Sequence, residues 1–196
     1  MPLRLLVFYG SYRPDRMGIR LARFVTSGLA ASGHDAALID AREIGLPILE
    51  TMYKEYAKGT APAAMERLAG QIRAADGFVF VTGEYNWGIQ PGLKNLTDHF
   101  LEEWFWRPAA IASYSAGRMA GARANVMWHG TLSEMGMVVI SSALAVGAIG
   151  TALDEAGTPT GAAGDFLEKS FPRFAADLEW WATAAKRQRE ATPPPY

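Results

Sequence analysis

The sequence predicts an α/β fold built on a doubly wound, five-stranded parallel sheet, and three observations support this prediction. Short apolar runs alternate with segments of helical periodicity, the connections between them are mostly short, and no repeat, low-complexity stretch or linker interrupts the alternation. A chain of 196 residues is long enough for one domain with a proper core. We therefore expect a single domain over residues 1–190 and a loose tail over residues 191–196.

The predicted elements begin with a strand over Leu3–Tyr9, which is apolar on both faces as a central parallel strand should be. A loop over residues 10–18 leads into a helix that Gly33 is placed to end. A second short strand is predicted over Ala36–Asp40. Residues 41–62 are long, irregular and aromatic, which makes them a candidate for a surface or subunit contact.

The rest of the chain continues the alternation of helices and strands. Residues 141–164 are small and glycine-rich and are assigned no regular structure. The predicted elements are a helix over 63–75, a third strand over 77–82, a helix from Pro91 to about Trp106, a fourth strand over 108–114, a helix over 122–135, a fifth strand over 137–140 and a closing helix over 166–189.

The composition limits the classes of function. A formal net charge of −1 gives no reason to expect nucleic acid or an anionic membrane as a partner. The absence of cysteine excludes disulfides and thiol-based redox chemistry, and the three histidines lie too far apart to predict a metal site. The longest apolar stretch, Met137–Ile149, is too short to span a bilayer, and the N-terminus lacks a signal-peptide pattern, so we expect a cytoplasmic location.

Three unusual loops, residues 10–18, 83–91 and 114–121, follow the predicted first, third and fourth strands. In the flavodoxin-like strand order 2-1-3-4-5, the first and third strands are neighbours, and all three loops project from the carboxyl edge of the sheet. We therefore expect these loops to converge on one crevice.

The first loop has the features of a phosphate site. Gly10 and Gly18 allow tight turns, the following helix contributes its positive end, and Ser11, Arg13 and Arg16 add hydrogen-bond donors. The competing interpretation is a glycine-containing turn with solvated arginines. The loop contains neither a Walker A motif nor the glycine pattern of dinucleotide-binding folds.

The second and third loops suit a flat polar ring. Glu84 and Asn86 can pair with groups at the ring edge, and Tyr85 or Trp87 can cover a face, although core packing competes for both aromatic residues. In the third loop, small residues let the backbone approach from the other side; these are Ser115, Gly117 and Gly121.

At these motifs the sequence resembles the NAD(P)H-dependent FMN reductase-like flavoproteins, which include quinone and chromate reductases. Gly10-Ser11-Tyr12-Arg13 resembles the phosphate motif of that family, and Glu84-Tyr85-Asn86 with Leu93-Lys94-Asn95 resembles its flavin-ring motif. The segment from Tyr114 to Arg123 is similar to the third ring-contacting loop. The resemblance extends from about residue 3 to residue 142.

The resemblance implies bound FMN, NADPH or NADH as electron donor, and transfer of a hydride through the flavin to a small oxidised acceptor such as a quinone or free flavin. Because the flavin carries this chemistry, no catalytic side chain is predicted. From the loops and the resemblance together, the residues predicted to bind the cofactor are Ser11, Arg13, Arg16, Met17, Gly18, Glu84, Tyr85, Asn86, Trp87, Ser115, Gly117, Arg118 and Gly121. Members of the family are commonly homodimers or homotetramers, with Trp104–Trp106 and Ala41–Pro62 the segments to search for the contact.

The chain departs from the family pattern at several positions. Arg16 and Gly18 stand where many relatives have serine and asparagine, and Trp87 replaces a small residue. Trp87 would either wall the substrate side of the flavin or reach across a subunit interface. Two other functions stay open: an FMN-binding electron carrier or redox sensor with little turnover, and a flavin-free α/β domain that binds another phosphorylated heterocycle.

Overall fold

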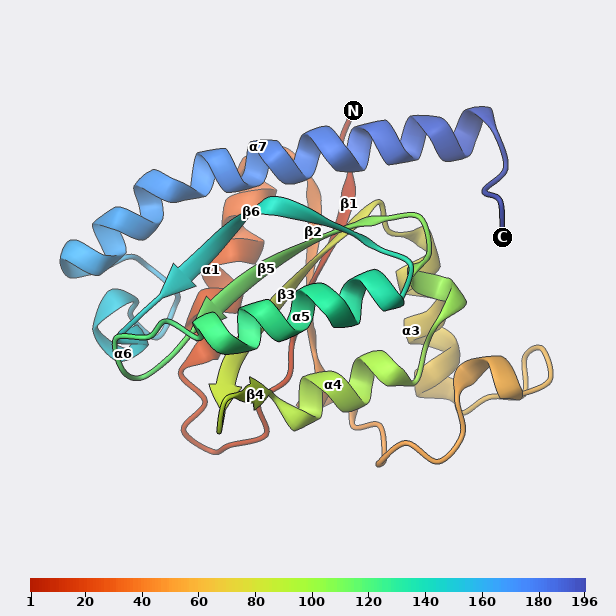
Figure 1. Ribbon diagram of the computed structural model, residues 1–196, viewed down its shortest axis with the longest axis horizontal. Helices are drawn as coiled ribbons and strands as arrows, with labels where there is room; N and C mark the ends of the chain where they lie inside the picture. Colours follow the sequence, from red (N-terminus) through yellow and green to blue (C-terminus); the bar gives the residue numbers. More distant parts are fainter.

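A computed structural model describes all residues from 1 to 196. Its five long strands form a parallel sheet in the order β2-β1-β3-β5-β6 (Figure 1). The two-residue strand β4 pairs antiparallel with the end of β3, and without it the order is the predicted 2-1-3-4-5. The flavodoxin-like fold class is confirmed. The strands are β1 (Arg4–Tyr9), β2 (Asp35–Asp40), β3 (Gly77–Tyr85), β4 (Gly88–Ile89), β5 (Pro108–Tyr114) and β6 (Val138–Val146).

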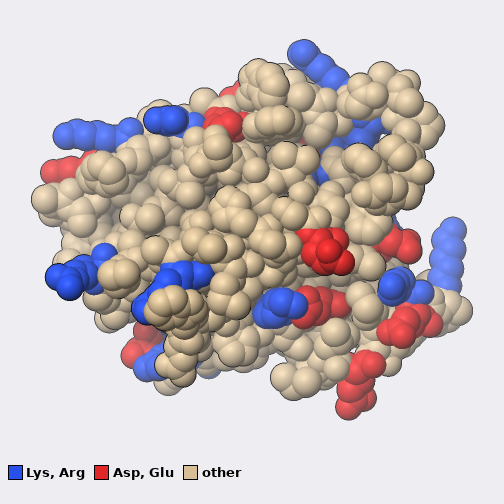
Figure 2. Space-filling view, in the orientation of Figure 1, with Lys and Arg blue, Asp and Glu red and all other residues tan.

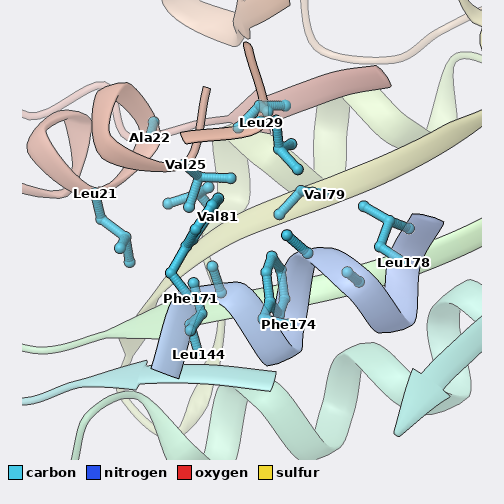
Figure 3. Packing of buried hydrophobic residues seen from close by; sticks show 14 of the residues in the cluster. Leu21, Ala22, Val25, Leu29, Val79, Val81, Leu144, Phe171, Phe174 and Leu178 are labelled. Carbon is cyan, nitrogen blue, oxygen red and sulfur yellow. The ribbon is translucent and has the colours of Figure 1, made fainter. Parts of the chain in front are cut away.

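Helices cover both faces of the sheet. The face with α1 (Gly18–Ala31) and α7 (Gly161–Ala191) is filled by aliphatic side chains and by Phe171 and Phe174 (Figure 3). The opposite face packs against α3 (Ala63–Ala74), α4 (Pro91–Asp98) and α5 (Ala122–Glu134). The shorter elements are α2 (Ala41–Ile44), η1 (Tyr53–Glu55), η2 (Glu102–Trp104) and α6 (Ile149–Ala152).

The second face is held by a cluster of aromatic rings. Phe8 stacks on Phe80 with ring centroids 5.4 Å apart, and Trp104 meets Phe8 edge-on at 5.2 Å. On the other side of Phe80, the indole of Trp128 from α5 lies at 5.3 Å. Such aromatic pairs contribute roughly 0.5–1.5 kcal/mol each beyond the area they bury. They fix α5 and the η2 turn against β1 and β3, the two strands that lead to the crevice.

The predicted helix from Pro91 to about Trp106 is wrong in length, since α4 ends at Asp98. The buried side chains of Phe100 and Trp104 suggested that the helix continues, but these residues lie in a turn and in η2. The indole N–H of Trp104 points back to the carbonyls of Thr97 and Phe100, at 3.3 and 3.1 Å. Trp104 is fully buried, so it belongs to the core and not to an exposed subunit contact.

The fifth long strand extends beyond the predicted end. Instead of stopping at Ile140, β6 runs through the small residues to Val146 and pairs with β5 across a register shift. Ile140, Leu144 and Val146 face the core while their neighbours are more exposed. The alternation typical of an edge strand was therefore present, but the serines and alanines obscured it. The closing helix also begins earlier than predicted, at Gly161.

Charged side chains of both signs are interspersed on the face seen in Figure 2, with no large patch of one sign. None of the helices combines the length and apolar character that a membrane crossing requires. The last residues leave α7 and turn back along the sheet end, where the carbonyl of Tyr196 accepts a hydrogen bond of 3.0 Å from the indole N–H of Trp106.

Candidate functional site

The three loops meet around a cavity of about 500 Å³ at the carboxyl edge of the sheet. This volume lies within the usual range for small-molecule sites, roughly 300–1,000 Å³. The convergence expected from the strand order is confirmed. The cavity is lined by Ser11, Arg13, Asp15, Arg16, Met17, Gly83, Glu84, Tyr85, Asn86, Tyr114, Ser115, Ala116 and Ile149.

Most of the residues predicted to bind a cofactor are in this lining, and five of the predicted residues are not. Gly18 and Gly121 lie behind the cavity wall, against Tyr114. Trp87 lies at the tip of the β3–β4 hairpin. Gly117 and Arg118 line a neighbouring cavity instead. Five other lining residues were not predicted individually to bind the cofactor: Asp15, Gly83, Tyr114, Ala116 and Ile149. Only Ile149 lies outside the three loops that were predicted to converge.

The first loop presents several free donors. Ser11 is buried, and its hydroxyl lies 3.0 Å from the phenol oxygen of Tyr85. The backbone N–H groups of Tyr12 and Gly18 donate to no acceptor within the protein. Unpaired N–H groups ahead of a helix N-terminus are suited to binding an anion.

The two arginines of this loop have different surroundings. Arg13 is exposed, and its Nε lies 3.1 Å from Oδ1 of Asp15. Arg16 is largely buried and forms an ion pair of 2.6 Å with Asp40, whose side chain is 2% exposed. Because the guanidinium of Arg16 is committed to Asp40 at the end of β2, it holds the loop in place. Arg13 is the more available of the two cations for a ligand.

The second loop is a tight hairpin. Tyr85 pairs with Gly88, and the two residues between them, Asn86 and Trp87, have φ angles of 47° and 76°. This is the geometry of a type I′ turn, in which asparagine is favoured but tryptophan is not. Trp87 is 66% exposed, and the guanidinium of Arg123 lies 4.4 Å from the centre of its ring.

Glu84 is used within the protein. One carboxylate oxygen accepts a hydrogen bond of 3.2 Å from the backbone N–H of Arg123, in the first turn of α5, and the carboxylate is also ion-paired with the Arg123 side chain. A negative charge at this position stabilises the helix N-terminus. Glu84 therefore joins the hairpin to α5, and its carboxylate is used within the protein although the residue also lines the cavity.

A buried pair missed by the sequence analysis forms the wall between the second and third loops. The side-chain N–H of Gln90 donates to the hydroxyl of Tyr114 over 2.8 Å, while Oε1 of Gln90 has no partner in the protein. Burial raises the pKa of the Tyr114 phenol, and the neighbouring Tyr9 raises it further. Tyr114 therefore stays protonated and can donate its own proton.

The packing of Tyr114 leaves no room for a side chain at Gly18. A Cβ at Gly18 would lie 2.0 Å from Cζ of Tyr114, so the ring packs directly on the start of α1. In the third loop, Gly121 has a φ of 72°, and a Cβ there would lie 2.7 Å from the Tyr114 carbonyl oxygen. Both glycines shape the wall without lining the cavity.

The Leu93-Lys94-Asn95 motif supports the crevice from behind. The Asn95 side chain accepts from the Leu49 backbone N–H over 2.9 Å and donates to the Pro47 carbonyl over 2.7 Å. A Cβ at Gly10 would lie 2.4 Å from Cα of Leu93, so α4 packs directly on the first loop. The motif fixes the positions of two loops and does not line the first cavity.

The donor set and the walls of the cavity fit a flavin mononucleotide. Free backbone donors, the Ser11 hydroxyl and Arg13 gather on one side and suit a phosphate. Tyr85, Tyr114 and Ile149 provide flat or apolar surface on the other side and suit a ring.

Strand order and site together define a flavodoxin-like protein with a ligand crevice at the carboxyl edge of its sheet. The NADPH-dependent FMN reductase family matches residues 3–151, and the chain belongs to this family. A NAD(P)H-dependent FMN reductase of Schizosaccharomyces pombe is 33% identical over 137 residues, which are 64% of each chain. A quinone reductase of Escherichia coli is 34% identical over 125 residues, which are 62% of this chain and 64% of the relative.

Among solved structures, the flavoenzyme NAD(P)H:(acceptor) oxidoreductase FerB of Paracoccus denitrificans has the same fold. Its TM-score is 0.72 at 22% identity, over 91% of this chain and 98% of that chain. The matches to the two sequence relatives span slightly less than two thirds of those proteins. The family predicted from the motifs is confirmed, and the contacts of individual residues with FMN stay predictions.

Proposed function

We propose that this chain is an FMN-dependent oxidoreductase that passes a hydride from NADPH or NADH to a small oxidised acceptor such as a quinone or free flavin. The observation that carries the proposal is the cavity at the carboxyl edge, where a loop rich in free donors meets two loops with aromatic walls. Membership of the NADPH-dependent FMN reductase family supports the same reaction.

The phosphate of FMN would bind the first loop, through the Ser11 hydroxyl, the free backbone N–H groups and Arg13. Arg16 would act through Asp40, since their ion pair holds the loop against the end of β2. The positive end of α1 adds to the attraction for the phosphate.

The flavin ring would lie between the second and third loops. Tyr85 and Tyr114 would bound it, Asn86 would pair with its edge, and the backbone at Ser115 and Ala116 would approach from the far side. FMN, when bound, supplies the hydride-accepting and electron-donating chemistry. The protein supplies orientation and donors that favour negative charge on the ring.

We also propose a homodimer or homotetramer in the cytoplasm. Exposed apolar side chains support self-association; these are Trp87 on the hairpin and Val126 and Met127 on α5, which are 66%, 71% and 46% exposed. Light scattering at several protein concentrations tests the oligomer, and a monomer at all of them would contradict it.

An absorbance spectrum of the purified protein, recorded anaerobically with added FMN and then NADPH, tests the proposed reaction. We expect flavin bands that bleach with NADPH and return when a quinone is added. Bands that persist after NADPH would contradict the enzyme and support a carrier or redox sensor. A protein that binds no FMN would contradict both and support a flavin-free domain.

A further inference from the structure

A second cavity of about 480 Å³ adjoins the first, and Ala116 lines both. It lies where three segments meet: the loop after β5, the end of β6 and the first turns of α7 (Figure 1). Nothing in the proposed binding of FMN uses this space. Two adjoining cavities with a shared wall suit a ligand that has two parts.

The walls of the second cavity are fixed by backbone contacts. The N–H of Ala148 donates to the carbonyl of Gly117 over 2.9 Å, which ties the end of β6 to the loop after β5. The Ser115 hydroxyl donates to the same carbonyl over 2.7 Å. A Cβ at Gly147 would lie 3.2 Å from that oxygen, so the two segments are in direct contact. The shared wall is therefore preformed.

Two side chains of this cavity are available to a ligand. Phe166, in the second turn of α7, is 69% exposed although its ring borders a mostly apolar cavity. Arg118 is exposed and forms no ion pair or hydrogen bond within the protein, and it is the only charged residue in the lining. An aromatic face binds a planar base, and a free guanidinium binds a phosphate.

We propose that the second cavity binds the adenosine 2′-phosphate end of NADPH, with the adenine against Phe166 and the 2′-phosphate on Arg118. This proposal rests on the proposed function, because the nicotinamide end would then enter the first cavity beside Ala116. Sites for NADH commonly place a carboxylate on the ribose 2′-hydroxyl, and sites for NADPH place an arginine there. The second cavity has no carboxylate in its lining, so its charge favours NADPH over NADH.

The test compares Arg118→Ala, Phe166→Ala and the wild-type protein. Arg67→Ala is the matched control, since Arg67 is an equally unpaired, exposed arginine on α3, which packs on the sheet face opposite α7. FMN affinity is measured first by flavin fluorescence and should be the same in all four proteins. Adenosine 2′,5′-bisphosphate is then titrated into the FMN-loaded proteins by calorimetry, without turnover.

We expect Arg118→Ala to weaken binding of the bisphosphate by about tenfold or more, the scale of one charge-assisted hydrogen bond. Phe166→Ala should weaken it by about tenfold, as for loss of one stacked base. In turnover, both variants should raise KM for NADPH and leave kcat and the KM for the quinone unchanged. Arg118→Ala should leave the KM for NADH unchanged, and Arg118→Lys should keep part of the NADPH affinity.

Several results would overturn the proposal. One is bisphosphate binding by both variants that equals that of Arg67→Ala. Another is an equal rise of the KM for NADPH and of the KM for NADH in Arg118→Ala, which would assign Arg118 to the pyrophosphate. If the wild-type protein binds no FMN, the proposed function itself fails, and the same titration into the FMN-free proteins still tests the second cavity.

Discussion

At the amino edge of the sheet, the buried carboxylate of Asp76 is paired from several sides, whereas the carboxyl edge keeps several donors open. Asp76 accepts from the backbone N–H of Arg4 and from Lys186, both at 3.0 Å, and Arg189 lies at 3.4 Å. These groups tie the C-terminal half of α7 to the starts of β1 and β3. The carboxylate of Asp76 is therefore used within the protein.

The amino edge satisfies its other cation in the same way. The guanidinium of Arg107 donates to the carbonyls of Ala75 and Phe105, over 2.7 and 2.8 Å. Burial and, to a smaller extent, the nearby Arg189 lower the pKa of Arg107 to about 10. The side chain still carries its charge at neutral pH. Most donors of this guanidinium are therefore used within the protein, where they stabilise the fold.

The carboxyl edge concentrates strain as well as open donors. Asn86, Trp87, Ala120 and Ala148 have positive φ, and only Trp106 among the non-glycine residues shares this feature elsewhere. Such backbone costs roughly 1–3 kcal/mol per residue and is typical of functional sites. The two edges contain the same types of charged residue. What distinguishes a charge that stabilises the fold from one that can bind a ligand is whether its hydrogen-bonding groups are already paired within the protein.

The largest expected effect is at the amino edge. Asp76→Ala leaves Lys186 and Arg189 without their partner in a partly buried place, so the free energy of unfolding should fall by about 3 kcal/mol. Urea denaturation measures this. FMN affinity should not change in the folded protein. Asp35→Ala is the matched control, because it breaks an exposed pair with Arg4 and should cost less than about 1 kcal/mol. Equal losses in the two variants would contradict the comparison.

Gly18→Ala should damage the wall of the carboxyl edge. Its new methyl group would overlap the Tyr114 ring, and relieving the overlap should cost about 1–3 kcal/mol of stability and also weaken FMN binding. Thermal unfolding and flavin fluorescence measure the two effects. Gly130→Ala, in α5 with nothing within 4 Å of the new Cβ, should be neutral or stabilising. FMN binding that is unchanged in Gly18→Ala would show that Tyr114 does not border the ligand.

Arg13→Ala should separate binding from stability. We expect FMN affinity to fall by about tenfold or more, because one charge-assisted hydrogen bond to the phosphate is lost. The denaturation midpoint should stay the same, since Arg13 is exposed. Asp15→Asn sharpens the test: it removes the carboxylate that competes for Arg13 and should tighten FMN binding. Unchanged affinity in Arg13→Ala would contradict the assignment of the phosphate to this loop.

The smallest effect concerns the strained hairpin. Trp87→Gly creates the preferred pair for a type I′ turn, which offsets the lost contact with Arg123, so stability should rise by about 0.5–1 kcal/mol. The KM for the acceptor should change at the same time. Trp180→Ala, at an equally exposed tryptophan within α7, should have little effect on either quantity. A less stable Trp87→Gly protein would mean that the indole contact outweighs the strain.

The element order and the position of the crevice could be predicted because both follow from local signals. Alternating apolar runs and helical periods predict a doubly wound parallel sheet, and such a sheet places its carboxyl-end loops together. The ends of elements were harder to predict. The Phe100 and Trp104 side chains mimic helical spacing, yet only tertiary packing decides that a turn and a 3₁₀ segment bury them.

The pairing of polar groups could not be predicted. Arg13 and Arg16 are equivalent in the sequence, and only the folded chain brings Asp40 to Arg16 and leaves Arg13 exposed. Gln90 follows the hairpin without any motif of its own, so its contact with Tyr114 depends on how β5 packs beside β3. The second cavity depends on α7 and β6, where the family motifs end.

The long helix α7 has a consequence for synthesis of the protein on the ribosome. Phe171, Phe174 and Leu178 cover Val79, Val81 and Leu144 of the sheet (Figure 3). All five long strands are translated before α7. Until the exit tunnel releases that helix, one face of the sheet has only α1 to shield it from water. The nascent chain should therefore be a substrate for chaperones that bind exposed aliphatic surface during translation, and its native state should form late.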